Sequence, residues 1–179
     1  ASKIGADSVA SSFYTSFHLP LTIARPFNTF GPRQSARAVI PTVITQIASG
    51  KKTLSLGDTS PTRDFTYVED TCRGLVSLML CKESIGEVVN VGSNNEFSIA
   101  QTIEIIKDIM GSNIEIKEDV KRIRPKKSEV FRLCCDNSKI KDLTGFSTEL
   151  SFEEGLKRTI DWFSDPKNLS VYKTELFNV

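Results

Sequence analysis

The sequence predicts an α/β fold, and three observations support that class. Short runs of β-prone residues alternate along the chain with amphipathic segments of helical periodicity. The 179 residues are 39% hydrophobic, which is enough for about one domain with a real core. A formal net charge of +1 at this apolar content argues against intrinsic disorder. Because five helical segments surround only a few short strands, we expect part of the sheet to lie outside this sequence.

The first predicted elements are a helix over residues 3 to 17 and a strand over residues 21 to 25. Apolar side chains recur in the helix at spacings of three and four: Ala6, Val9, Ala10, Phe13 and Phe17. Pro20 ends this helix, and the strand is a short apolar run between two prolines. Such a run predicts a strand that is buried on both faces.

A second helix is predicted over residues 40 to 47, closed by Gly50, and a short strand over residues 53 to 56. Thr66 and Glu69 have the spacing of a capping box, in which the Thr66 hydroxyl accepts from the Glu69 N–H and the Glu69 carboxylate reaches back. The helix that this box begins carries one apolar stripe: Val68, Cys72, Leu75, Val76 and Met79.

The last two predicted helices begin at further capping boxes, at residues 98–101 and 151–154. Their apolar stripes are Ile99, Ile103, Ile106 and Met110 in the first, and Phe152, Leu156, Ile160 and Phe163 in the second. Residues 88 to 91 and 114 to 117 are predicted to be strands.

Composition excludes several classes of protein. With 23 Lys and Arg against 22 Asp and Glu, the chain gives no reason to expect nucleic acid or an anionic membrane surface as a partner. No window approaches the roughly 18 apolar residues of a membrane span. The four cysteines show no CxxC spacing and there is one histidine, so we expect no metal site and no disulfide framework. Reduced thiols in the cytoplasm are the expectation.

Residues 121–127 form the densest basic run, with five charges in seven residues. Such a run is typical of a nucleic-acid patch. Here no aromatic residue interrupts it and the rest of the chain is neutral, so we expect no nucleic-acid partner.

Several short motifs occur along the chain in a fixed order. They are an Ala-Ser-Lys start ahead of the first helix, RPFNTFGPR at 25–33, GD at 57–58, RDFTYVED at 63–70, NVG at 90–92 and RP at 124–125. Together they resemble the extended short-chain dehydrogenase/reductase family, the NAD-dependent sugar-nucleotide epimerases and 4,6-dehydratases. The resemblance covers essentially the whole chain.

This resemblance implies the C-terminal part of a Rossmann-type NAD-binding sheet together with the small α/β substrate-binding domain. Residues 1–33 would end the dinucleotide-binding domain. Residues 34–179 would belong mostly to the sugar-nucleotide-binding domain, with residues 66–92 returning to the Rossmann sheet. NAD would be bound mostly by an N-terminal part that precedes this sequence.

Lys3 matches the lysine of the family's YxxxK pair, whose tyrosine would lie two positions before Ala1. Residues at i and i+4 share a face of a helix, so the Lys3 ammonium would lower the pKa of that tyrosine towards neutrality. By resemblance Lys3 is catalytic and also binds the nicotinamide ribose. We expect this segment alone to be inactive, without the tyrosine and the glycine-rich NAD loop.

The resemblance implies four polar ligands of the substrate diphosphate region: Asn28, Arg63, Asn90 and Arg124. Asn28 and the preceding Pro26 would also line the nicotinamide side. Each residue has a structural alternative. Asn28 would cap its own turn, Arg63 would pair with Asp58 or Asp64, and Asn90 would bridge buried backbone. The functional hypothesis requires residues 28, 63 and 124 to converge around one gap of pyrophosphate size.

Four apolar residues match the family's pocket for the nucleotide base and ribose: Ala38, Val39, Leu54 and Leu56. Ordinary core packing is the alternative for each of them. Uridine is the base that we favour.

The resemblance implies oxidation of a sugar nucleotide at C4, followed either by 4,6-dehydration or by 4-epimerisation. Residues 124–130, with Asp136 and Lys139, look most like UDP-N-acetylhexosamine 4,6-dehydratases, so dehydration is the favoured reading. A non-catalytic sugar-nucleotide-binding module is the alternative of another class. The family also implies a homodimer through helix 3–17 and a neighbouring helix, with Phe13 and Tyr14 towards the partner.

Overall fold

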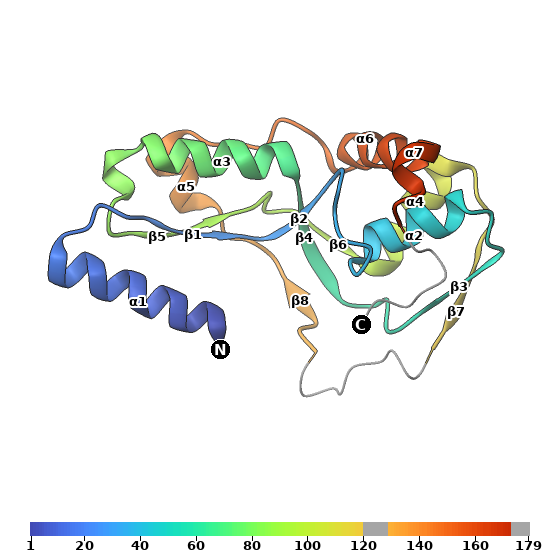
Figure 1. The fold of residues 1–179 in the computed structure, drawn as a ribbon, viewed down its shortest axis with the longest axis horizontal. Coiled ribbons are helices and arrows are strands. Elements are labelled where there is room, and N and C mark those ends of the chain that lie inside the picture. Colours follow the sequence, from blue (N-terminus) through green and yellow to red (C-terminus); the bar gives the residue numbers. More distant parts are fainter. Residues whose placement is uncertain (120–128, 173–179) are drawn as a thin grey trace.

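Three small sheets follow one another along the long axis of the molecule, with helices packed around them (Figure 1). The computed structural model describes residues 1–119 and 129–172. The helices are α1 (Ser2–Phe17), α2 (Val39–Ala48), α3 (Val68–Leu80), α4 (Ile99–Met110), α5 (Ser138–Thr144), α6 (Phe152–Ser164) and α7 (Pro166–Leu169), with a 3-10 turn at Lys82–Ser84. The strands are β1 (Ile23–Pro26), β2 (Asn28–Phe30), β3 (Thr53–Leu56), β4 (Thr62–Tyr67), β5 (Val88–Val91), β6 (Glu96–Ser98), β7 (Glu115–Glu118) and β8 (Arg132–Leu133).

The first sheet consists of β1 and β5, which run parallel in the register Ile23↔Val88 to Pro26↔Val91. Helices α3 and α5 cover one of its faces, and α1 lies on the other (Figure 1). The α3 helix packs closely on β5, because a Cβ added at Gly74 would lie 2.6 Å from a Val91 methyl group. The buried residues here form a small cluster, the smaller core: Leu78, Val89, Val91, Ile140 and Phe146.

The central sheet is built around β4. This strand pairs with β2 and β8 in parallel and with β6 in antiparallel orientation. Four of its six residues, Asp64 to Tyr67, are buried. The central sheet therefore joins the two ends of the molecule.

The third sheet, β3 with β7, packs with α2, α4 and α6 around the main core. The predicted stripes provide it: Ile40, Val43 and Ile44 from α2, Ile103 and Ile106 from α4, and Phe152, Leu156, Ile160 and Phe163 from α6. Phe30, Phe65 and Phe97 add aromatic rings around Phe152; the Phe97 and Phe152 ring centroids lie 4.3 Å apart. Helical periodicity therefore predicted the main core correctly.

One of the three predicted capping boxes is complete, and a second has one of its two hydrogen bonds. Ser98 and Gln101 form the complete box, and Ser151 Oγ accepts from the Glu154 N–H at 3.1 Å. The box at Thr66 was wrong, because β4 continues to Tyr67 and buries Thr66 within the strand. The Thr66 hydroxyl hydrogen-bonds to Asp64 Oδ1 instead, and α3 begins without a side-chain cap.

The predicted burial of the first strand and of the third helix was also wrong in part. In the predicted strand 21–25, residues 21–24 are only half-buried and Arg25 is exposed, where it pairs with Asp7 of α1 at 2.6 Å. The α3 stripe does form one face, but that face points outwards, with Met79 75% exposed. The side of α3 that packs on the sheet is more polar: Asp70, Thr71, Gly74 and Leu78.

Within the two described stretches, no helix combines the length and the apolarity that crossing a bilayer would need. All four cysteines are free thiols.

Candidate functional site

The carboxyl ends of β1 and β5 lie side by side and define one edge of the first sheet. The register places Arg25 opposite Asn90 and Pro26 opposite Val91. Asn28 follows two residues after the end of β1, as the first residue of β2. Ligands of open parallel α/β sheets bind at this kind of edge, so Pro26, Asn28 and Asn90 stand where a ligand is expected.

Asn28 and Arg63 lie on neighbouring strands and face the same side of the central sheet. Asn28 is the register partner of Phe65, and Arg63 comes two residues before Phe65 on β4. Residues two apart on a strand share a face, so the structure brings these two predicted ligands together. Arg124, the third, lies outside the described residues.

Arg63 is a largely buried cation, with a side chain 16% exposed. Its guanidinium donates to the carbonyls of Thr62 and Val130, at 2.8 and 2.7 Å, and to Glu129 Oε1 at 2.8 Å. The structural alternative for Arg63 was thus right in kind, since Arg63 forms an ion pair, but the partner is Glu129 rather than Asp58 or Asp64. These contacts attach the segment that precedes β8 to the side of β4.

Asn90 bridges two segments of backbone at the end of β5. Its Nδ2 donates to the Asp136 carbonyl at 3.4 Å, and Asn137 Nδ2 donates to the Gly92 carbonyl at 3.0 Å. A Cβ at Gly92 would lie 2.5 Å from that of Cys135, so these two segments of the chain are in direct contact. The hydrogen bond to Asp136 supports the alternative role of Asn90 as a bridge between backbone segments. The amide is only half-buried, so Asn90 is also still a ligand candidate.

Of the three residues predicted for the nicotinamide side, Asn28 is half-buried, whereas Lys3 and Pro26 are exposed. Pro26 ends β1, and Lys3 stands in the first turn of α1. Because α1 runs back beneath β1, its first turn lies towards the carboxyl end of that strand (Figure 1). Tyr14, predicted to face a partner, lies against Gly86 of its own chain, where an added Cβ would come within 2.7 Å of the ring.

The four predicted base-pocket residues lie around the main core. Ala38 is the half-buried N-cap residue of α2, and Val39 packs on the core from the first turn. Leu54 is fully buried and Leu56 nearly so. For Leu54 the structure thus gives the packing role that the sequence analysis left open as the alternative.

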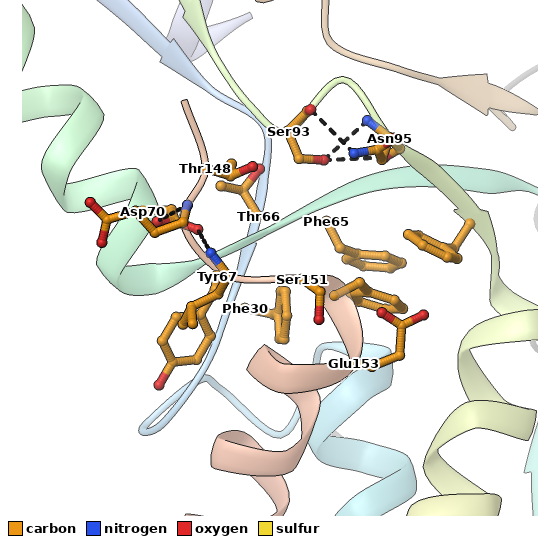
Figure 2. Close-up of a pocket in the computed structure, with 14 residues that line it drawn as sticks. Phe30, Phe65, Thr66, Tyr67, Asp70, Ser93, Asn95, Thr148, Ser151 and Glu153 are labelled. Carbon is orange, nitrogen blue, oxygen red and sulfur yellow. Dashed lines mark hydrogen bonds between the residues drawn. The ribbon is translucent and has the colours of Figure 1, made fainter. Parts of the chain in front are cut away.

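A separate cavity of about 370 Å³ lies between β4, the loop after β5 and the start of α6 (Figure 2). Its lining includes the aromatic rings of Phe30, Phe65 and Phe152, and it contains none of the described residues predicted for the site. Asp70, Glu149 and Glu153 make its polar part acidic, which disfavours a diphosphate there. The predicted substrate residues therefore do not converge on this cavity.

The buried nucleophiles of the region are held in their protonated forms. Burial, and then the charge of Asp64, raise the pKa of Cys135 to about 12. Burial likewise raises the pKa of Cys134 and of Tyr67. None of these three groups is prepared to act as an anion near neutral pH. In the described part of the chain, no group of three or more His, Cys, Asp or Glu residues could hold a metal ion.

Sequence reasoning missed Asp64, which is fully buried beside Arg63. The only signal was its place inside the RDF motif, where it was considered solely as an ion-pair partner of Arg63. In the structure its two oxygens accept hydrogen bonds from both flanking segments of the candidate site.

Comparisons with family models, with curated proteins and with solved structures all indicate the same family. The model of the family described as GDP-mannose 4,6 dehydratase matches residues 1–159. The low-salt glycan biosynthesis protein Agl12 of Haloferax volcanii is 36% identical over 163 residues, which make up 91% of this chain and 51% of that protein.

Two solved structures show the same fold. DesIV, a dTDP-glucose 4,6-dehydratase of Streptomyces venezuelae with NAD bound, superposes with a TM-score of 0.84 at 27% identity, covering 95% of this chain and 51% of that one. The UDP-glucuronic acid 4-epimerase of Bacillus cereus, in complex with UDP-glucuronic acid and NAD, gives 0.82 at 29% identity, covering 94% and 51%. The chain spans about half the length of the curated relatives that it matches.

The match over residues 1–159 covers most of the sequence, and the order of strands and helices agrees with these Rossmann-fold enzymes. This chain therefore belongs to the extended short-chain dehydrogenase/reductase family of NAD-dependent epimerases and dehydratases.

Proposed function

We propose that this chain is the substrate-binding half of an NAD-dependent nucleotide-sugar 4,6-dehydratase acting on a UDP-N-acetylhexosamine. The observation that carries the proposal is the placement of Asn28 and Arg63 on one face of neighbouring strands, next to the carboxyl end of β1. An amide and a guanidinium there suit a diphosphate, because a guanidinium fork matches phosphate oxygens.

NAD, held in part by Lys3 and Pro26, would supply reversible hydride transfer for the reaction. Lys3 would lower the pKa of a tyrosine one helical turn before it, and that tyrosinate would take the proton from the C4 hydroxyl. A ketone at C4 would acidify the C5 hydrogen, so that water would be lost across C5 and C6. The net change of the reaction is the loss of one water. Because Lys3 alone supplies no base, we expect the 179 residues by themselves to be inactive.

The pairing of β1 with β5 supports the expected division of the chain. Residues 1–33 and 66–92, which contain β1, α3 and β5, would complete a dinucleotide-binding sheet, and most of the rest would hold the nucleotide sugar. Exposed Lys3 and Pro26 fit the NAD ribose and nicotinamide side, whereas the pyrophosphate of NAD would bind elsewhere.

A 4-epimerase is the second candidate, favoured by the similarity to the Bacillus cereus epimerase. The two reactions are separated by NMR analysis of the products that the full-length protein forms from UDP-GlcNAc and NAD. A dehydratase replaces the C6 hydroxymethyl signals with those of a methyl group beside a 4-keto sugar. An epimerase keeps the hydroxymethyl group and inverts C4. Binding of UDP-GlcNAc without any turnover would instead support a non-catalytic binding module.

A further inference from the structure

Asp64 is a fully buried carboxylate on the opposite side of β4 from Arg63. Its Oδ1 accepts from the Ser93 N–H at 3.0 Å, the Ser93 hydroxyl at 2.8 Å and the Thr66 hydroxyl at 3.3 Å. Its Oδ2 accepts from the N–H groups of Asn94 at 2.8 Å and Cys135 at 3.1 Å. A carboxylate has about four lone-pair sites, so this group is saturated.

The donors come from two segments that are distant in sequence and that flank the candidate site. Ser93 and Asn94 form the loop that leaves the carboxyl end of β5, three residues after Asn90. Cys135 lies between β8 and Asp136, the residue whose carbonyl accepts from Asn90. Asp64 therefore connects the end of the first sheet, through the central strand, to the segment that Arg63 holds.

The loop turns at Asn94, which has a left-handed φ of +60°. Asparagine adopts this conformation more readily than most residues other than glycine, so the sequence suits the turn. Here the Asn94 N–H points at Asp64, and the Asn95 N–H donates to the Ser93 hydroxyl at 3.1 Å.

We propose that Asp64 is a positioning residue for the reaction, and this inference rests on the proposed function. Asp64 is too buried to touch a substrate. It fixes the distance between the sheet edge that carries Pro26 and Asn28, on the nicotinamide side, and Arg63, on the diphosphate side. A nucleotide sugar that spans both would thus be held with its C4 against the nicotinamide.

The test compares two buried carboxylates in the full-length protein. Asp70 is the control, since it is 2% exposed, accepts from the N–H groups of Glu149 and Leu150, pairs with Arg73, and contacts none of the predicted ligands. Asp64→Asn and Asp70→Asn each remove a buried negative charge that accepts from backbone N–H groups, at nearly unchanged side-chain size. Thermal unfolding, kcat and KM for UDP-GlcNAc, and the Kd for UDP are measured for each variant.

A positioning role predicts that both variants unfold at lower temperature and that only Asp64→Asn loses kcat, by about 10- to 100-fold, the scale of an ångström-sized misplacement. The Kd for UDP should change less than threefold, because Arg63 remains. Equal kcat values for the two variants would overturn the inference and leave the proposed function standing. A wild-type protein without turnover would instead overturn the proposed function, and the inference with it.

If Asp64→Asn does not fold, Ser93→Ala decides, because it keeps the carboxylate and removes the 2.8 Å hydroxyl contact. We expect kcat of Ser93→Ala to fall a few-fold with the KM for UDP-GlcNAc nearly constant. An unchanged kcat in this variant would contradict the positioning role.

Discussion

The two ends of the molecule contrast in how completely they bury their apolar residues. The main core joins α2, α4 and α6 to the central and third sheets, and every predicted stripe of these helices contributes to it. The smaller core has five buried residues, and α1 adds none. Ile4, Phe17, Met79 and Leu80 are each more than 70% exposed on α1 and α3.

This difference shows that an amphipathic stripe predicts which face of a helix is apolar, but not which other element packs against that face. The stripes of α4 and α6 meet each other across the main core, whereas most of the α3 stripe is exposed, with only Val68 packed on that core, and the α1 stripe adds no buried residue. The chain spans about half the length of its curated relatives, and in the proposed enzyme these faces would be covered by further sheet and helices or by a second copy.

The largest expected effect is on the main core. Phe163→Ala should lower the free energy of unfolding by about 3–5 kcal/mol, the usual cost of removing a buried aromatic ring. Phe17→Ala, at a residue 72% exposed, should change it by less than about 0.5 kcal/mol. Urea denaturation of both variants measures the contrast. Similar losses would mean that Phe17 is buried in solution and that the comparison fails.

Arg63→Ala should weaken binding of the nucleotide sugar by roughly 1.5–3 kcal/mol, the scale of a hydrogen bond to a charged group. Calorimetry with UDP-GlcNAc and the full-length protein measures this loss. Arg158→Ala is a control for the removal of an arginine, because Arg158 forms exposed ion pairs with Glu69 of α3 and with Glu154 of its own helix, α6. If Arg63→Ala binds as tightly as Arg158→Ala, Arg63 does not bind the diphosphate and only anchors Glu129.

Alkaline pH should destabilise the fold through Cys135. Its pKa is about 12 in the folded chain, against an ordinary thiol pKa of 9.0, so the folded state retains a proton that the unfolded state releases. This contribution is complete below about pH 9 and is lost as the pH rises towards 12. Urea midpoints measured from pH 8 to 11 should fall, and Cys135→Ala should reduce the slope. Equal slopes in both proteins would show that Cys135 ionises freely when folded.

A smaller effect is expected at the helix caps. Ser98→Ala removes the hydroxyl of a complete capping box and should cost about 1 kcal/mol. Ser11→Ala, in the exposed middle of α1, is the matched control and should be neutral to within about 0.5 kcal/mol. Chemical denaturation separates the two, and a neutral Ser98→Ala would mean that α4 is stabilised by packing alone.

The smallest effect on stability is expected on the outer face of α1, where association is the informative readout. We expect Phe13→Ser with Phe17→Ser to leave the unfolding free energy nearly unchanged, since both rings are largely exposed. If α1 mediates the proposed homodimer, light scattering at several concentrations will show a dimer that these changes dissociate. A wild-type protein that stays monomeric at every concentration would exclude α1 as a dimer interface.

Local periodicity and capping were sufficient to predict most helices and several strands. The stripes of α2, α4 and α6, the caps at Ser98 and Ser151, and strands β3, β5 and β7 all follow from spacings within about a dozen residues. The motifs and their order along the chain were also sufficient to identify the family, because both can be read from the sequence without any knowledge of tertiary contacts.

Only the tertiary structure decided what depends on contacts between distant segments. Strands β2, β6 and β8 are two or three residues long and exist because β4 pairs with them, so no local pattern predicted them. The same is true of the partner of Arg63, which is 66 residues away, and of Asp64, whose backbone N–H donors lie 29 to 71 residues further along the chain. A stripe of side chains determines which face of a helix is apolar, but only the arrangement of the other elements determines whether that face is covered.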